Sequence, residues 1–247
     1  MEDDGSFVIN GEKTWISNGG IADVYIVIAR TSAGSGPKGL SALVVEAGTP
    51  GLEIEPFEVI NAHPIATLRF NECRIPRSNL IGEPSMGFKV AMANLDVFRP
   101  SGGACGIGFA RRALHETLEH TQGRHAFGKA LSDIETVRVR LADMAVELEM
   151  ATLAVYHAVW ATDMLGGRQS HLASIAKLGA TEVAQRVIDS AVQLLGGPGV
   201  KRGSIIERLY RDVRPLRIGE DASDIQRLII ARHLLGRDGP GPVRGHK

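Results

Sequence analysis

The pattern of hydrophobic and polar positions changes its period once along the chain, close to residue 82. Before that point, short apolar runs alternate with turn-forming residues at the spacing of hairpins, which predicts β-strands. Strands are predicted at residues 6–9, 13–17, 22–29, 40–46, 52–60 and 67–75. The dipeptide Asn10-Gly11, between the first two, predicts a tight hairpin. Short strands at this spacing are typical of a small antiparallel sandwich or barrel.

From Phe88 onward, apolar residues recur every three or four positions, which predicts helices. The predicted helices span residues 88–121, 131–165, 170–195, 205–210 and 225–235. Pro100 lies inside the first of these helices and is expected to perturb or kink it. Long helices with short glycine-containing connections form an antiparallel bundle.

The predicted fold class is therefore α+β multidomain, with a small antiparallel β-sandwich or barrel followed by an antiparallel four-helix-type bundle. We expect the β domain at residues 1–80 and the helical domain at residues 81–236. Residues 237–247 are rich in glycine, proline and arginine and predict a disordered tail.

Composition excludes several classes of function. Lys plus Arg and Asp plus Glu both number 28, so no basic field indicates nucleic acid. Cys73, Cys105 and the eight scattered histidines provide neither a disulfide framework nor metal-ligand spacing. No apolar run approaches the length of a membrane span, and the acidic start is unlike a signal or transit peptide. These features predict an intracellular, cytoplasmic protein without a metal site.

The strongest candidate for chemistry is Glu220, which lies on a glycine-containing turn before the apolar run at residues 225–235. Ser223 followed by Gln226 predicts a capping box, and both Asp221 and Ser223 are suited to the N-cap position. A carboxylate at a helix entrance is either a catalytic base or an ordinary complement to the helix dipole. The residues alone favour the second interpretation.

Six segments, taken in order, resemble the acyl-CoA dehydrogenase family. The first is residues 11–19, Gly-Glu-Lys-Thr-Trp-Ile-Ser-Asn-Gly, which is similar to the start of that family's middle β domain. The resemblance implies that Trp15 and Ser17 lie against the isoalloxazine of FAD. Without it, Trp15 would be a buried sheet aromatic and Ser17 a turn residue.

The second segment, residues 87–99, resembles the beginning of the family's first long C-terminal helix. The resemblance implies that Asp96 and Arg99 bind the substrate, an acyl-CoA. By spacing alone, the same two residues would form an i,i+3 ion pair on a helix surface.

The third and fourth segments resemble FAD-binding turns of the family, residues 123–129 (Gly-Arg-His-Ala-Phe-Gly-Lys) and residues 193–199 (Gln-Leu-Leu-Gly-Gly-Pro-Gly). The resemblance implies that Arg124 binds the pyrophosphate of a neighbouring subunit's FAD, which suits a guanidinium fork. His125 stands where lysine is usual. The cofactor-binding residues implied by the two turns are Arg124, Phe127, Gln193, Leu194, Gly196 and Gly197. The glycines also suit a helix C-cap, and both roles can hold together.

The last two segments are residues 207–212 (Glu-Arg-Leu-Tyr-Arg-Asp) and the turn around Glu220. With them the resemblance covers nearly all of residues 5–236, and it implies a flavoprotein oxidoreductase of fatty acid metabolism. The implied reaction is α,β-dehydrogenation of an acyl-CoA thioester, with Glu220 as the α-proton base and hydride transfer to FAD. Isovaleryl-type relatives carry the base at the position of Phe98, which cannot serve. The resemblance also implies an electron-transfer flavoprotein as acceptor and a homodimer or homotetramer.

Two residues beside the base depart from the family pattern and are counted among the substrate-binding candidates. Gly219 replaces a tyrosine, which would widen the acyl pocket for a bulky group. Asp221 replaces a glycine; it either raises the pKa of Glu220 by repulsion or caps the helix and points away. Capping is the favoured interpretation.

The family's N-terminal helical domain and its Thr-Glu-Pro-x-Ala-Gly-Ser-type segment have no counterpart in the sequence. A truncated gene product, a fragment and one half of a two-chain enzyme are all open explanations. Two functional alternatives follow, a catalytically impaired or non-catalytic oligomerising protein, and a relative with other flavin chemistry such as oxidase or hydroxylase action. The presence of Glu220, Arg99 and Arg124 argues against the non-catalytic alternative.

Overall fold

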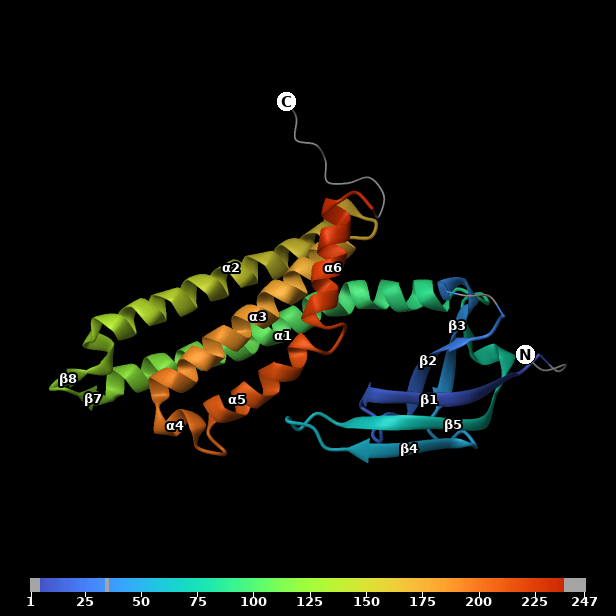
Figure 1. Cartoon of the computed structure of the whole chain (residues 1–247), viewed down its shortest axis with the longest axis horizontal. Helices are drawn as coiled ribbons and strands as arrows, with labels where there is room; N and C mark the ends of the chain where they lie inside the picture. Colours follow the sequence, from blue (N-terminus) through green and yellow to red (C-terminus); the bar gives the residue numbers. More distant parts are fainter. Residues whose placement is uncertain (1–4, 34–35, 238–247) are drawn as a thin grey trace, which may run out of the picture. The chain divides into compact units, whose positions relative to one another are not determined.

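A computed structural model describes residues 5–33 and 36–237, which form two compact units (Figure 1). The first unit ends at Asn94 and the second begins at Leu95, so the boundary falls inside the long helix α1 (Gly87–Gly123). The disordered tail was predicted for residues 237–247, and all of these except residue 237 lie outside the described residues. Each unit is considered by itself below.

The first unit contains two three-stranded antiparallel sheets, which confirms the predicted β architecture. One sheet has the order β1 (Phe7–Ser17), β5 (Ile65–Ile75), β4 (Leu52–Phe57). The other has the order β2 (Val24–Arg30), β3 (Leu40–Glu46), β6 (Leu80–Ile81), with the 3₁₀ turns η1 (Gly36–Gly39) and η2 (Arg77–Asn79) between strands. Inward-facing residues of both sheets share one apolar core, formed by residues such as Phe7, Tyr25, Leu43, Leu68 and Ile75.

The hairpin predicted at Asn10-Gly11 is wrong. Strand β1 continues through this dipeptide and pairs with β5 along its whole length, and the register shifts between Ile9 and Gly11. Gly11 has φ 135°, and the Asn10 side chain exchanges two hydrogen bonds with Glu72, at 2.6 and 2.8 Å. The dipeptide therefore forms a β-bulge, because a long partner strand satisfies its main chain better than a turn would.

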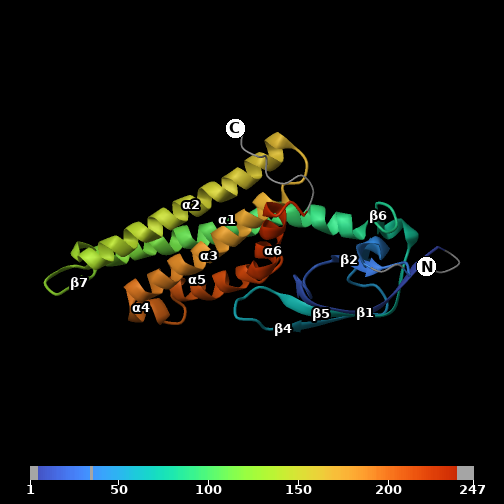
Figure 2. The same ribbon diagram turned by 45° about the horizontal axis from the view of Figure 1, so that its top comes forward.

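The second unit is a helical bundle, as predicted (Figures 1 and 2). Its helices are α1, α2 (Glu135–Leu165), α3 (Ser170–Leu195), α4 (Gly197–Val200), α5 (Ile205–Val213) and α6 (Ser223–Leu234). A short hairpin of β7 (His125–Ala126) and β8 (Lys129–Ala130), followed by the 3₁₀ turn η3 (Leu131–Asp133), joins α1 to α2, and η4 (Arg214–Arg217) precedes the turn before α6. Helix α1 runs unbroken through Pro100, so the proline does not end it.

Alanines dominate the core of this bundle. Those of α3 recur on one face at Ala173, Ala176, Ala180 and Ala184, and all are buried. Small side chains on one face let neighbouring helices approach closely. A Cβ added at Gly103 of α1 would lie 3.2 Å from the Ala176 carbonyl oxygen, so α1 and α3 are in close contact here.

In the described part of the chain, no helix is long and apolar enough to cross a membrane. The same residues contain no group of three or more His, Cys, Asp and Glu side chains placed to hold a metal ion.

Candidate active site

The turn before α6 holds two consecutive non-glycine residues in the left-handed region. Glu220 has φ 53° and Asp221 has φ 72°. Such a conformation costs on the order of 1 to 3 kcal/mol per residue and persists only where surrounding contacts enforce it. Three donated hydrogen bonds do so here, because Lys177 Nζ binds the Asp221 carbonyl at 2.7 Å and Gln226 Nε2 lies 3.3 Å from the carbonyls of both turn residues.

The predicted capping of α6 is wrong. The helix begins at Ser223 with Ala222 as N-cap, and no side chain caps it. The Ser223 hydroxyl donates to Glu182 Oε1 at 2.7 Å. Gln226 faces the carbonyls of the turn and not the helix entrance, and the Asp221 carboxylate is also engaged elsewhere. The residue types were suited to capping, but tertiary partners bind them more strongly.

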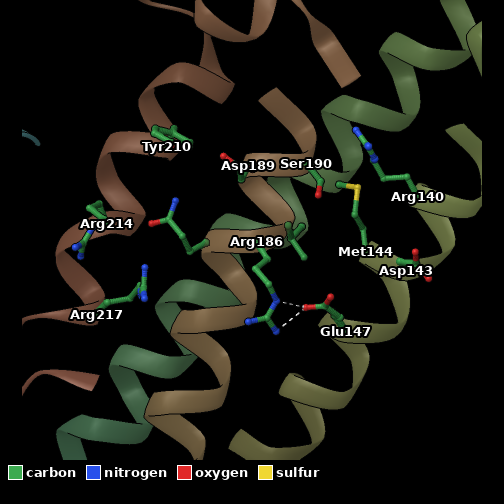
Figure 3. A pocket seen from close by; sticks show the side chains of 12 residues that line it. Arg140, Asp143, Met144, Glu147, Arg186, Asp189, Ser190, Tyr210, Arg214 and Arg217 are labelled. Atoms are coloured by element: carbon green, nitrogen blue, oxygen red, sulfur yellow. Dashed lines mark hydrogen bonds and ion pairs between the residues drawn. The ribbon is translucent and has the colours of Figure 1, made fainter. Parts of the chain in front are cut away.

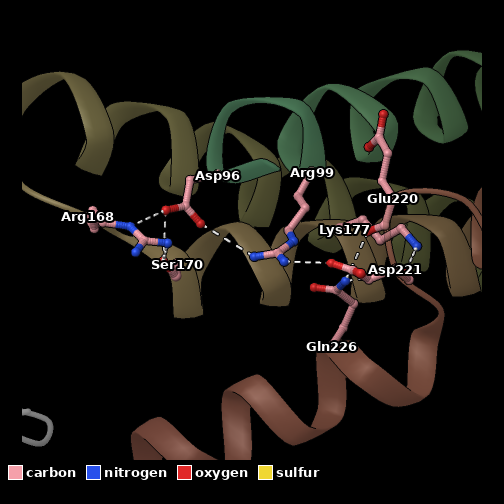
Figure 4. Close-up of polar contacts among 8 residues, drawn as sticks. All are labelled: Asp96, Arg99, Arg168, Ser170, Lys177, Glu220, Asp221 and Gln226. Carbon is pink, nitrogen blue, oxygen red and sulfur yellow. Dashed lines mark hydrogen bonds and ion pairs between the residues drawn. The ribbon is translucent and has the colours of Figure 1, made fainter. Parts of the chain in front are cut away.

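Asp221 belongs to a chain of ion pairs that crosses the bundle (Figure 4). Arg99 of α1 donates from Nη2 to Asp221 Oδ2 at 2.7 Å and from Nη1 to Asp96 Oδ1 at 3.4 Å. Asp96 Oδ2 also accepts from Arg168 Nε at 2.7 Å and from the Ser170 hydroxyl at 2.9 Å. Arg99 is only 2% exposed, so the predicted i,i+3 pair exists but is buried and not on a helix surface.

The Glu220 side chain points away from this chain of ion pairs, toward α1 (Figure 4). A Cβ added at Gly102 would lie 2.9 Å from Glu220 Oε2, so the glycine makes room for the carboxylate. Oε2 is buried and has no hydrogen-bond partner among the described residues. Burial raises the pKa of Glu220, the charges of Lys177 and Arg99 oppose that rise, and Asp221 adds to it by repulsion. A carboxylate with a free oxygen and a raised pKa can act as a general base.

A cavity of about 570 Å³ lies at one end of the bundle, where the β7–β8 hairpin begins and α3 ends. It is lined by His120, Arg124, Leu131 and residues 193–198. Five of the cofactor-binding candidates meet here, namely Arg124, Gln193, Leu194, Gly196 and Gly197. Gly196, with φ 65°, is the C-cap of α3, which confirms the capping role predicted for it, and it also lines this cavity. No hydrogen bond or ion pair within the described chain engages the Arg124 guanidinium, which leaves its fork free for an anion.

The other three cofactor-binding candidates do not line this cavity. Phe127 occupies the β7–β8 turn with φ 54° and is 93% exposed. Trp15 and Ser17 belong to the β unit, at the end of β1. Trp15 has φ 62°, packs edge-on against Phe57 at 5.0 Å between ring centroids, and is 67% exposed. The alternative that Trp15 is a buried sheet aromatic is therefore wrong.

A second cavity, of about 580 Å³, lies between α2, α3 and α5 and was not predicted (Figure 3). Its charged lining carries both signs, from Arg140, Asp143, Glu147, Arg186, Asp189, Arg214 and Arg217. Arg186 is neutralised by Glu147 at 2.7 Å. Since the lining residues come from α2, α3, α5 and η4, no local sequence pattern could reveal this cavity.

The structure also adds residues to the site that the sequence motifs did not single out. Gly102 admits the Glu220 carboxylate, and Lys177 and Gln226 fix the main chain of the turn. A usable signal existed for Lys177, since it falls on the buried alanine face of α3, where a lone lysine is unusual. Gly219 lies beside Glu220 with its side-chain position open to the surroundings, the nearest atom to an added Cβ being the Pro215 oxygen at 3.6 Å.

Two family models match the chain, one over each of its two parts. The family model described as acyl-CoA dehydrogenase, C-terminal domain, matches residues 85–235. The model described as acyl-CoA dehydrogenase, middle domain, matches residues 1–73.

Individual relatives match along most of the chain. It is 41% identical over 237 residues to the mitochondrial short-chain specific acyl-CoA dehydrogenase of Rattus norvegicus, covering 95% of this chain and 57% of the rat protein. Butyryl-CoA dehydrogenase from Megasphaera elsdenii has the same fold with a TM-score of 0.91 and 35% identity, covering 95% of this chain and 62% of that one. PigA, solved with FAD and proline, matches with a TM-score of 0.91 and 32% identity, covering 97% of this chain and 63% of PigA. The chain thus spans less than two thirds of the length of each of these relatives.

Proposed function

The chain belongs to the acyl-CoA dehydrogenase family, and from this premise we propose that it acts in the FAD-dependent α,β-dehydrogenation of an acyl-CoA thioester. Glu220 is the base that removes the α-proton. The observation that carries the proposal is the state of this side chain, a half-buried carboxylate whose Oε2 is buried and has no partner among the described residues. It stands on a turn held by three hydrogen bonds from Lys177 and Gln226.

The α-proton of a thioester is only weakly acidic, so its base needs a dry setting and a raised pKa. The Glu220 Oε2 atom is buried, and burial raises the pKa of the Glu220 carboxyl. The cations Lys177 and Arg99 oppose that rise, which helps the carboxylate to remain ionised before the reaction. We infer that Glu220 accepts the proton on Oε2, since this oxygen is unpartnered and lies beside Gly102.

Gly219 and Asp221 flank the base in the chain, and Asp221 is linked through Arg99 to Asp96. We propose that these four residues form the substrate side of the site. Arg99 is held by both aspartates, so it acts as a fixed positive charge near the base and not as a mobile ligand. Gly219 leaves open space where a side chain would stand, which supports a bulky or cyclic acyl group.

The residues around the Arg124 cavity fit the diphosphate part of FAD. Arg124 offers a guanidinium fork that has no partner in the described part of the chain, and Gly196 and Gly197 allow close approach of the main chain. Trp15, Ser17 and Phe127 are proposed to contact the cofactor as well, and the exposed rings of Trp15 and Phe127 are available for such contact. When bound, FAD would supply the acceptor for the hydride that leaves the β-carbon.

Anaerobic titration with acyl-CoA tests the proposal. The purified chain is loaded with FAD and its visible spectrum recorded while a series of thioesters is added. Bleaching of the flavin band in the parent chain and none in Glu220→Gln is the expected result. A parent chain that takes up FAD but is not bleached by any acyl-CoA contradicts the proposed reaction.

A second candidate is supported by the likeness to PigA, which was solved with proline. Oxidase chemistry on a small amine would then replace acyl-CoA dehydrogenation. The same preparation distinguishes the two, because an oxidase produces hydrogen peroxide in air from an amine substrate without any thioester.

Three further properties are proposed, the first two on family grounds and the location on the absence of a disulfide framework in the sequence. The electron acceptor is an electron-transfer flavoprotein, which a coupled assay with and without that protein checks. The assembly is a homodimer or homotetramer, and FAD bound at Arg124 belongs to the neighbouring subunit. The protein is intracellular and cytoplasmic.

A further inference from the structure

Lys177 is a buried cation whose position needs an explanation. It lies in the middle of α3 on the alanine face and is 1% exposed. No carboxylate among the described residues lies within ion-pair distance of its ammonium; Nζ donates to the main-chain carbonyl of Asp221 at 2.7 Å. Burying an ammonium for packing alone is unfavourable, so a neutral residue would serve the fold better.

The hydrogen bond from Lys177 acts on the strained part of the turn. Asp221 is held at two points, its carbonyl by Lys177 and its carboxylate by Arg99. With its carbonyl and its carboxylate both fixed, Asp221 has little freedom to rotate, and Gln226 Nε2 holds the carbonyl of the preceding Glu220–Asp221 peptide at 3.3 Å. The direction of the Glu220 side chain toward Gly102 depends on that peptide.

The charge of Lys177 also faces the candidate base. The charged groups that act on Glu220 are Lys177 from α3, Arg99 from α1 and Asp221 on its own turn. Burial raises the pKa of Glu220, and Lys177 lowers it more than Arg99 does. Lys177 itself faces Glu220, Asp221, Arg99 and Glu182; burial lowers its pKa, and the three carboxylates oppose that change.

We propose that Lys177 is the positioning residue of the candidate base, holding the Glu220–Asp221 turn through the Asp221 carbonyl and so aiming the Glu220 carboxylate at the space beside Gly102. The inference rests on the proposed function for what Glu220 does in the reaction. The effect of Lys177 on the position and titration of Glu220 does not depend on that function and can be measured separately.

Two variants separate the charge of Lys177 from its hydrogen bond. Lys177→Met removes both, and Lys177→Gln removes the charge but keeps an N–H donor. The matched control is Thr181→Val, one turn further along α3. Thr181 is fully buried and donates to the Lys177 carbonyl at 2.9 Å, and among the described residues it makes no side-chain hydrogen bond to the Glu220 turn.

The readout is the titration of Glu220 in the chain without FAD or substrate. Side-chain carboxyl ¹³C NMR of glutamate-labelled protein follows it, with the Glu220 signal assigned by its loss in Glu220→Gln. We expect Lys177→Met and Lys177→Gln to raise the Glu220 pKa by about one unit or more, since an adjacent opposite charge is lost. Amide hydrogen exchange at residues 219–222 should accelerate at least about tenfold in Lys177→Met and much less in Lys177→Gln.

Thr181→Val should lower the thermal stability while leaving the Glu220 titration and the turn's exchange unchanged. The proposal is overturned if Lys177→Met lowers only the melting temperature and neither readout moves. Should Lys177→Met fail to fold, an unchanged Glu220 pKa in Lys177→Gln overturns it instead. A parent chain that gives the expected titrations but is not bleached by acyl-CoA refutes the proposed function and leaves the role of Lys177 standing.

Discussion

The Glu220 turn and the Arg124 cavity belong to the same helical unit but differ in how their charged groups are satisfied. At the turn, Arg99 is shared by two carboxylates and Lys177 binds a carbonyl. At the cavity, the Arg124 guanidinium has no partner within the described residues. The comparison indicates that the candidate base is oriented by the protein's own contacts, whereas the candidate anion-binding group is left for a ligand to complete.

The largest effect that tests this comparison is expected for Glu220→Gln. Loss of the base should reduce kcat by about 10² to 10⁴-fold. Stability should be unchanged or slightly raised, because the buried and unpartnered Oε2 no longer carries charge. Steady-state rates and thermal unfolding measure the two effects. Glu119→Gln, an exposed acid on α1, is the control and should change neither.

Arg99→Met should be the most destabilising change at the turn. It leaves Asp96 and Asp221 without their buried partner, at a cost of about 3 kcal/mol in the free energy of unfolding. Urea unfolding measures the loss. Arg112→Met removes an exposed i,i+4 pair with Glu116 and should cost no more than about 0.5 kcal/mol. Equal losses in the two variants would show that the turn is not held by its own buried contacts.

Arg124→Met should weaken FAD binding without lowering stability, in contrast to Arg99→Met. The FAD dissociation constant should rise about 10- to 100-fold, since a charged hydrogen bond contributes about 1.5 to 3 kcal/mol. The unfolding free energy of the FAD-free chain should not change, because the guanidinium has no partner to lose among the described residues. Isothermal titration with FAD and urea unfolding separate the two quantities, with exposed Arg138→Met as control. A loss of stability without a loss of FAD affinity would reverse the comparison.

The smallest effect concerns pH, where two carboxyls of the bundle should act with opposite signs. Hydrogen bonds from Ser223 and Arg217 outweigh burial and lower the pKa of Glu182 below its usual 4.5. Its contribution to stability is therefore present above pH 4.5 and is lost as the pH falls through the lower folded pKa. Glu220 has a raised pKa, so its contribution is fully present below pH 4.5 and is lost as the pH rises through the folded value.

Urea unfolding between pH 3 and 7 follows both contributions. Glu182→Gln should flatten the acid side of the stability profile, and Glu220→Gln should flatten the side above pH 4.5. An unaltered profile in either variant would contradict the environment assigned to that carboxyl.

Much of the architecture follows from periodicity in the sequence. Helix α3 was predicted with its observed bounds, Ser170–Leu195, because its apolar face is long and regular. The bulge at Asn10-Gly11 could not be predicted, since the dipeptide has the chemistry of a tight turn and only the distant strand β5 decides otherwise. Local signals thus identified the elements, while their partners were set by residues far away in the chain.

At the candidate site, too, local signals identified the residues while distant residues set their partners. The sequence placed Glu220 and the substrate-binding candidates Asp96, Arg99 and Asp221 at one site. Ion pairs do join the last three, while the Glu220 side chain points away from them (Figure 4). Capping of α6 was wrong because Glu182, on another helix, engages Ser223. Tertiary charge partners of this kind leave no local mark in the sequence.

The ion pair between Arg99 and Asp221 also constrains the order in which substitutions could have accumulated. Glycine, usual at this position in the resembling family, adopts φ 72° without strain, whereas aspartate does not. Without Arg99, an aspartate here would add both strain and an unneutralised charge next to Glu220. An ancestor with glycine at 221 would therefore tolerate the change to aspartate only if Arg99 was already in place. Once Asp221 is present, Arg99 can no longer be lost without cost, so the two positions become mutually dependent.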